Sequence, residues 1–288
     1  MFAALRTSHL AALLENIRFE QSLFTLPFAY LGMILAAHGL PRLDQFIWIT
    51  LAMVGARTFA MNMNRVIDLD LDRRNPRAAR RPLPSGRLSL RAVVVYCAAS
   101  VGLLFVAALQ LHPLCVMLFP LAMTVFIAYS YVKRVSWLTH MVLGAALAGA
   151  PVGGWVAVAG SLSVEPLLLF LTVWTWATGF DILYACGDTG EDRRLGVHTI
   201  SVDFGPRTAL IASATFHVGT VVMLVVLGAA FALSWPYWAG VAVVAGLLVY
   251  EHSIVTPNDL SRLTTAFFTI NGYISTLVFA GTAASLLL

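Results

Sequence analysis

The sequence predicts an all-α polytopic membrane protein with nine transmembrane helices arranged as a bundle. Of its 288 residues, 59% are apolar and only 11% are Asp, Glu, Lys or Arg, whereas a soluble domain carries about 25% charged residues. A soluble core of this length could not hide so much apolar surface, and disordered chains are poor in apolar residues. One span needs about 20 apolar residues to cross a ~30 Å hydrocarbon core, and the chain contains roughly nine such stretches.

The spans follow one another along what we expect to be a single domain, residues 1–288. We place them at 21–38, 44–66, 92–111, 113–131, 139–160, 165–186, 207–231, 235–250 and 263–288. The preceding residues 1–20 are amphipathic and lack the pattern of a signal peptide. They form either a helix that lies in the membrane interface or a first helix packed on the bundle.

The three cysteines all fall in predicted spans and form no CxxC pair; they are Cys97, Cys115 and Cys186. We expect them to be buried as small apolar residues, without a disulfide or a metal site.

The basic residues orient the chain. With nine spans, almost every Lys and Arg falls on one side; Arg42 falls on the other, and Arg57 and Arg65 lie in or at the end of the second span. Because cytoplasmic loops carry the Lys/Arg excess, we expect the N-terminus and the acidic loops to face the cytoplasm of a bacterial cell, from its inner membrane. The excess of basic residues gives the chain a pI near 9.2. The attraction of basic loops to anionic lipid headgroups explains this excess. No nucleic-acid motif is present, and no obligate protein partner is inferred.

Two acidic clusters lie at the predicted cytoplasmic ends of even-numbered spans. In the first, Asn64, Asp68 and Asp72 are spaced i, i+4, i+8, which places them on one helical face. In the second, Asp181, Tyr184, Asp188 and Asp192 recur at steps of three and four residues. Arginines follow both clusters, whereas Asp70 and Glu191 point away from these faces.

Solvated salt bridges would explain one such cluster, but two clusters in register on one side favour a metal site. Stacked carboxylates repel one another, and a divalent cation relieves that repulsion. Mg²⁺ prefers carboxylates together with water and substrate phosphate oxygens. The spacing therefore favours a magnesium and diphosphate site at Asp68, Asp72, Asp188 and Asp192.

Four basic or aromatic positions have two interpretations each. Tyr129 and Lys133, spaced i, i+4, are either an interfacial anchor or a group that holds a leaving diphosphate. Arg57 lies inside the second span, where a charge costs at least a few kcal/mol. Arg57 and Arg65 therefore bind an anionic ligand or form a salt bridge, for instance with Glu20 or Asp181.

These motifs resemble the UbiA superfamily of intramembrane prenyltransferases. Asn64-x-x-x-Asp68-x-x-x-Asp72, followed by RPLPSG at 81–86, resembles its first aspartate-rich motif, and Asp181-x-x-Tyr184-x-x-x-Asp188-x-x-x-Asp192 resembles its second. Tyr129-x-x-x-Lys133 resembles the pair between them. The segments IRFEQSLFTLPFAYLG and FFTINGYIS look most like UbiA-like enzymes of the futalosine route to menaquinone, which are often grouped with 4-hydroxybenzoate polyprenyltransferases. Arg65 departs from ubiquinone-type members, which often carry an acid there.

The resemblance implies a central cavity under a cytoplasmic cap, open sideways to lipid. It implies Mg²⁺-dependent transfer from a polyprenyl diphosphate to an aromatic acid, either 1,4-dihydroxy-6-naphthoate or 4-hydroxybenzoate, in quinone biosynthesis. The metal ligands would be the four aspartates above, and Lys133 and Tyr129 would stabilise the leaving diphosphate. Asp181 or Asp188 would be the base. The substrate-binding residues would be Asn64, Arg65, Arg57 and Tyr184.

Three alternatives stay open at this point. Within the superfamily they are another prenyltransferase, such as one for haem, chlorophyll or archaeal lipids, or an intramembrane terpene cyclase. From a different class, a transporter would fit the Gly- and Pro-rich fifth span, although small residues there also favour close helix packing.

Overall fold

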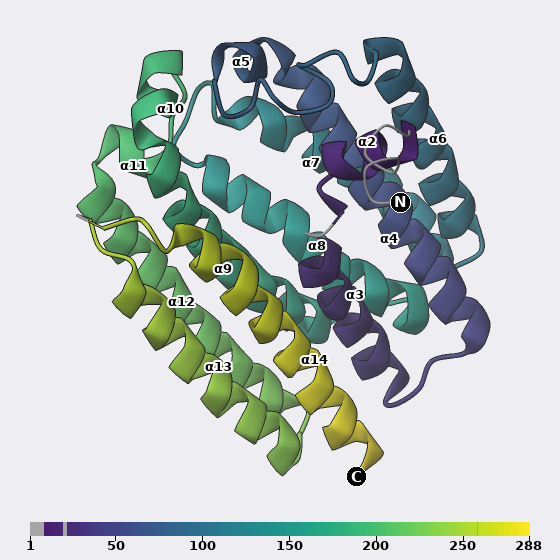
Figure 1. Ribbon diagram of the computed structural model, residues 1–288. Helices are drawn as coiled ribbons and strands as arrows, with labels where there is room; N and C mark the ends of the chain where they lie inside the picture. The colour runs from purple at the N-terminus through teal and green to yellow at the C-terminus, as the bar shows by residue number, and fades with distance from the viewer. Residues whose placement is uncertain (1–8, 20–21, 258) are drawn as a thin grey trace, which may run out of the picture.

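The computed structural model describes residues 9–19, 22–257 and 259–288, and these residues fold into a helical bundle (Figure 1). The helices are α2 (His9–Asn16), α3 (Ser22–Ala37), α4 (Leu43–Ile67), α5 (Leu69–Arg74), α6 (Leu90–Leu109), α7 (Pro113–Val132), α8 (Thr139–Ala159), α9 (Val164–Ala185), α10 (Thr189–Leu195), α11 (Ile200–Asp203), α12 (Pro206–Ala230), α13 (Trp235–Ile254) and α14 (Asn271–Leu287). A 3-10 turn (Cys186–Asp188) joins α9 to α10, and a π-helical segment (Thr265–Ile270) precedes α14.

Eight helices in the described part of the chain are long and apolar enough to cross a membrane. They correspond to eight of the nine predicted spans. The first predicted span is the shorter helix α3, whose 16 residues extend about 24 Å at 1.5 Å per residue. The prediction of an integral membrane protein is therefore confirmed, with eight long spans and one shorter apolar helix where we expected nine spans.

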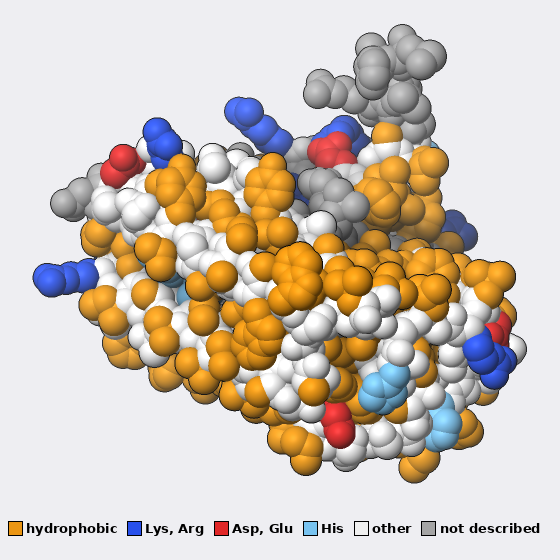
Figure 2. Space-filling model, turned by 90° about the horizontal axis from the view of Figure 1, so that it is seen from below, with side chains coloured by type: hydrophobic (Ala, Val, Ile, Leu, Met, Phe, Trp, Pro, Cys, Tyr) orange, Lys and Arg blue, Asp and Glu red, His pale blue; other side chains and the backbone are white. Residues whose placement is uncertain are grey.

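The surface agrees with this assignment. Large apolar side chains are exposed along the long helices, for example Met117 on α7, Val218 on α12 and Val249 on α13. Seen from below, the molecule is covered mainly by hydrophobic side chains, with few charged ones (Figure 2). Water would not solvate such a surface, because exposed apolar patches of this extent are rare on soluble proteins.

Charged residues gather instead at one end of the bundle. We call the charged end the region formed by α5, α10 and the connecting residues 75–89 and 186–205; α5 and α10 lie together at the top of Figure 1. Hydrogen bonds join its parts: Arg194 on α10 donates to the carbonyl of Arg74 at 2.9 Å, and the His198 amide donates to the carbonyl of Lys133 at 2.7 Å. The ends of α5, α7 and α10 are thereby held close together.

Small residues allow α3 and α8 to pack closely. A Cβ added to Gly32 would lie 2.0 Å from the carbonyl oxygen of Pro151, and one added to Gly154 would lie 2.3 Å from that of Ala29. Since lipid tails offer no hydrophobic drive for helix association, close backbone approach of this kind supplies the packing energy. The Gly- and Pro-rich fifth predicted span, α8, thus serves as a packing surface.

The described part of the N-terminal stretch packs on the bundle. Ala12 on α2 is buried in a cluster with Leu83, Leu88 and Val93. The Asn16 side chain, also buried, donates to Asn62 on α4 at 2.8 Å. Of the two interpretations, the structure favours the packed helix for residues 9–16; residues 1–8 and 20 lie outside the described residues.

Candidate active site

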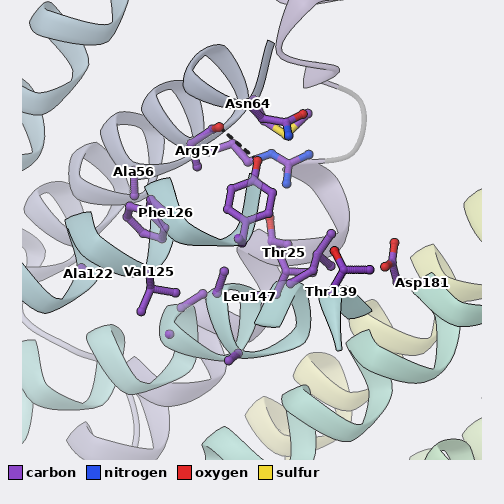
Figure 3. Close-up of a pocket in the computed structure, with 18 of the residues that line it drawn as sticks. Thr25, Ala56, Arg57, Asn64, Ala122, Val125, Phe126, Thr139, Leu147 and Asp181 are labelled. Atoms are coloured by element: carbon purple, nitrogen blue, oxygen red, sulfur yellow. Dashed lines mark hydrogen bonds between the residues drawn. The ribbon is translucent and has the colours of Figure 1, made fainter. Parts of the chain in front are cut away.

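A cavity of about 790 Å³ runs from the charged end into the bundle, between α4, α7, α8 and α9. All eleven site residues predicted from the sequence line it. Most of them lie toward the charged end, whereas the deeper walls are largely apolar, with side chains such as Met53, Leu104, Phe119 and Leu147. Figure 3 shows part of this wall, including Ala56, Ala122, Val125 and Phe126. The cavity therefore joins a charged mouth to an apolar chamber.

Asp68 is the centre of the first cluster, and α4 ends immediately before it. Its side chain is only 2% exposed. Oδ2 accepts hydrogen bonds from Asn64 at 2.8 Å and from Lys133 at 2.5 Å, while buried Oδ1 has no hydrogen bond and lies 3.5 Å from Arg134. Asn64 also donates to Ser130. Asp68 thus forms one hydrogen-bond network with Asn64 and Lys133, which come from two different helices.

Asp72 is held by arginines rather than by the other acids. Arg81 donates to both of its oxygens, at 2.8 and 3.0 Å, and buried Arg65 lies 3.7 Å from Oδ2. Arg65 also donates to the Asn16 carbonyl at 3.3 Å. Arg65 therefore joins α2 to the first cluster, and its predicted salt bridge is with Asp72.

The second cluster spans a break in the helix that the spacing did not reveal. Asp181 and Tyr184 lie on α9, Asp188 ends the 3-10 turn, and Asp192 lies on α10. Asp188 is bound by Arg77, which follows the first cluster; this contact raises the pKa of the Arg77 guanidinium. The Arg77–Asp188 pair connects the two acidic clusters across the cavity mouth.

Tyr129 and Arg57 lie along the cavity wall toward its interior. The Tyr129 hydroxyl donates to the carbonyl of Ala60 at 3.1 Å, which is the dashed bond in Figure 3. Arg57, on α4, also lines the cavity. Its suggested partner Glu20 lies outside the described residues. The other suggested partner, Asp181, is instead 2.6 Å from His140 Nδ1.

Sequence reasoning missed His140, Arg77 and Arg81. The two arginines were visible after the first motif, but their partners depend on how residues 75–89 turn back over the cavity. His140 stands alone in an apolar stretch without a motif, so no spacing signal could have connected it to Asp181. Glu191 pairs with Arg194 outside the cavity, in agreement with its exclusion from the predicted site.

The donor set at the mouth fits Mg²⁺ by its chemistry. Four carboxylates and the Asn64 amide oxygen are hard oxygen donors, which this cation prefers, and Asp68 Oδ1 is a buried oxygen without a hydrogen bond. Among the described residues, however, no three acidic, His or Cys side chains are gathered around one point. Lys133, Arg81 and Arg77 instead neutralise Asp68, Asp72 and Asp188. Metal coordination therefore requires these cations to give up part of their contacts.

Residues 25–273 match the model of the UbiA prenyltransferase family. The chain belongs to this family. It is 31% identical over 256 residues to a 4-hydroxybenzoate octaprenyltransferase of Aliivibrio fischeri (strain MJ11), covering 89% of this chain and 88% of the relative. A relative of the same name from Photobacterium profundum is 29% identical over 257 residues, covering 89% of both chains.

Solved structures of the family have the same fold. An apo UbiA homologue from Aeropyrum pernix K1 superposes with a TM-score of 0.83 at 32% identity, covering 91% of this chain and 96% of that one. A homologue from Archaeoglobus fulgidus, bound to DMAPP and Mg²⁺, superposes with a TM-score of 0.72 at 21% identity, covering 96% and 99%.

Family membership decides between the classes of function left open by the sequence. The predicted family is confirmed, and the protein is an enzyme, a prenyltransferase of the group that transfers alkyl groups other than methyl. The transporter hypothesis is wrong. The family name leaves the acceptor, the donor chain length and the individual roles of the cavity residues to be argued from the site.

Proposed function

We propose that this protein transfers a polyprenyl group from a polyprenyl diphosphate to an aromatic carboxylic acid in quinone biosynthesis, with release of diphosphate. The observation that carries the proposal is one cavity of about 790 Å³ in which a charged mouth opens into an apolar chamber. A prenyl diphosphate has this same division between an anionic head and an apolar tail. The names of the similar curated enzymes support an aromatic acid as acceptor.

The diphosphate is proposed to lie between the two acidic clusters. Asp68, Asp72, Asp188 and Asp192 would hold Mg²⁺, which neutralises charge on the diphosphate when bound. The Archaeoglobus fulgidus homologue, which shares the fold, is described as bound to Mg²⁺ with DMAPP and, in another structure, with GPP.

Lys133 and Tyr129 stabilise the negative charge that develops on the leaving diphosphate oxygen. A preorganised donor in a water-poor site stabilises such charge more strongly than water does. Lys133 is near enough to act because it already lies at the mouth, against Asp68. Asn64 and Arg65 hold the two aspartates of the first cluster in place: Asn64 donates a hydrogen bond to Asp68, and Arg65 lies against Asp72.

Loss of diphosphate leaves an allylic cation that water would quench. Apolar and aromatic walls exclude water, and aromatic faces stabilise a cation directly; Phe126, Trp176 and Phe180 line the cavity. An electron-rich ring carbon of the acceptor then forms the new C–C bond, and a carboxylate removes the ring proton. We assign the acceptor's carboxylate to Arg57 and Tyr184, because both line the same cavity.

We further propose that α3 completes a nine-helix bundle with the eight long spans, and that residues 1–288 form one domain. The charged end would face the cytoplasm from a bacterial inner membrane, because it carries most of the arginines. No nucleic acid or obligate protein partner is included in the proposal; the partners are the two substrates and membrane lipid.

A membrane-fraction assay tests the proposal. Radiolabelled polyprenyl diphosphate and Mg²⁺ are offered with 4-hydroxybenzoate and, in parallel, with 1,4-dihydroxy-6-naphthoate; EDTA and the Asp68→Ala variant are controls. A prenylated product with one acceptor, lost in both controls, supports the proposal and selects the acceptor. Diphosphate release without either product would contradict it and favour a terpene cyclase or a different acceptor.

A further inference from the structure

His140 and Asp181 form a close pair in the cavity wall, beside the charged mouth. His140, the second residue of α8, has a side chain only 2% exposed, and its Nδ1 is 2.6 Å from Asp181 Oδ2 on α9. Both residues line the cavity. Figure 3 shows Asp181 beside Thr139, the residue before His140, with Arg57 and Asn64 on the α4 side of the same cavity.

The chemistry of the pair fixes its hydrogen bond. An ionised carboxylate only accepts hydrogen bonds, so His140 Nδ1 carries the hydrogen when Asp181 is charged. His140 Nε2 is buried without a hydrogen bond in the described structure, so the ring makes its one polar contact through Nδ1. His140 Nδ1 therefore donates to one oxygen of Asp181 and fixes the orientation of the carboxylate.

The other oxygen of Asp181 remains available to a ligand. Its side chain is 21% exposed, and the exposed part faces the cavity. Asp181 lies four residues before the end of α9, or about 6 Å along the helix axis, so it sits below the mouth rather than in it. Within the described parts of the chain, it also has none of the arginine or lysine contacts that hold Asp68, Asp72 and Asp188.

We propose that Asp181 is the base that removes the ring proton of the acceptor, and that His140 is the positioning residue that holds it ready. The assignment rests on the proposed function. The allylic C–O bond breaks with its electron pair leaving on diphosphate, and a ring π pair forms the C–C bond. The ring C–H bond then breaks: its proton goes to Asp181, its electron pair restores the aromatic ring, and the proton later leaves to water at the mouth. Asp188, the other candidate base, is committed to Arg77 and to the proposed metal site.

The test is a ring-deuterium isotope effect on turnover in membranes that contain the full chain. The acceptor that the wild type prenylates is supplied with hydrogen or deuterium at the carbons ortho to its phenol. His140→Leu removes the donor at similar volume, whereas His140→Asn keeps an N–H near the position of Nδ1. His198→Leu is the matched control, because His198 pairs with Asp203 at 3.1 Å outside the cavity.

We expect His140→Leu to lower kcat by about 10- to 100-fold, within the roughly 10²–10⁴-fold that a positioned base contributes, with a smaller change in the KM for the acceptor. Its isotope effect should exceed that of the wild type, because proton removal becomes slower than ionisation of the donor. His140→Asn should recover most of the turnover and the wild-type isotope effect, and His198→Leu should match the wild type. A merely structural role of His140 would lower turnover without changing the isotope effect.

Two results would overturn the assignment while leaving the proposed function standing. One is a His140→Leu enzyme with wild-type turnover, and the other is reduced turnover with an unchanged isotope effect. If His140→Leu fails to accumulate, Asp181→Asn answers the same question, since an amide accepts the His140 hydrogen bond but removes no proton; product formation near the wild-type rate would overturn the assignment. A wild type that prenylates neither acceptor would instead refute the proposed function.

Discussion

Lys133→Met is the substitution that best separates catalysis from stability at the cavity mouth. Lys133 is the only lysine in the chain. Its Nζ lies 2.5 Å from Asp68 Oδ2, with 26% of the lysine side chain exposed against 2% of the aspartate. We propose that this cation stabilises the leaving diphosphate, but the same contact would be expected of a purely structural salt bridge. The two roles predict different magnitudes.

The expected loss of stability is modest. Removing one partner of a fully buried ion pair costs about 3–5 kcal/mol, whereas an exposed pair contributes about 0–1 kcal/mol. Asp68 keeps its hydrogen bond from Asn64 at 2.8 Å and has Arg134 at 3.5 Å, so we expect a loss of about 1–2 kcal/mol, between those limits. The variant should therefore fold and insert.

The expected loss of activity is larger. Removing one preorganised donor to a developing oxyanion costs about 10²–10³ in kcat, or about 2.7–4 kcal/mol. The assay is single-turnover transfer of radiolabelled prenyl diphosphate at saturating Mg²⁺, with the thermal unfolding midpoint measured on the same preparations. Arg87→Met is the control, because it removes an exposed pair with Glu15, and neither residue lines the cavity.

Two outcomes would refute this role of Lys133. A Lys133→Met variant with wild-type transfer would show that the cation does not act on the diphosphate. Recovery of transfer in the double variant Asp68→Asn, Lys133→Met, relative to Lys133→Met alone, would show that Lys133 serves only to neutralise Asp68. We expect the double variant to be at least as impaired as either single one.

Three further outcomes are expected. Asp192→Ala should abolish transfer while leaving a folded, membrane-inserted protein, because Asp192 lines the mouth as a proposed metal ligand; product formation and gel-filtration profile measure the two effects. Chelation with EDTA should stop transfer and excess Mg²⁺ should restore it, and transfer that persists in EDTA would contradict the metal assignment. Gly32→Leu should lower the free energy of unfolding by about 1–3 kcal/mol or more, because its Cβ would meet the Pro151 carbonyl oxygen at 2.0 Å. Gly102→Ala is the control and should not lower this free energy, because the space around Gly102 is open. Thermal unfolding measures both effects.

The helices and their order could be predicted from hydropathy, because a membrane requires long apolar segments whose backbone is satisfied internally. Interruptions within those segments could not be predicted from hydropathy. The break between α9 and α10 at Cys186–Asp188 and the π-helical segment at Thr265–Ile270 interrupt runs of residues that still look helical. Hydropathy averages over a window and is insensitive to one altered turn.

Much of the site could be predicted from the sequence, because the residue types, their helical faces and their common end of the bundle follow from periods of three and four residues. The partners of the acidic residues could not be predicted in this way. Asp68 meets Lys133 across 65 residues, Asp188 meets Arg77 across 111, and Asp181 meets His140 across 41. Local spacing fixes which side chains share a face of one helix. Only the packing of separate helices determines which cation neutralises each acid and which acid is left to face the cavity.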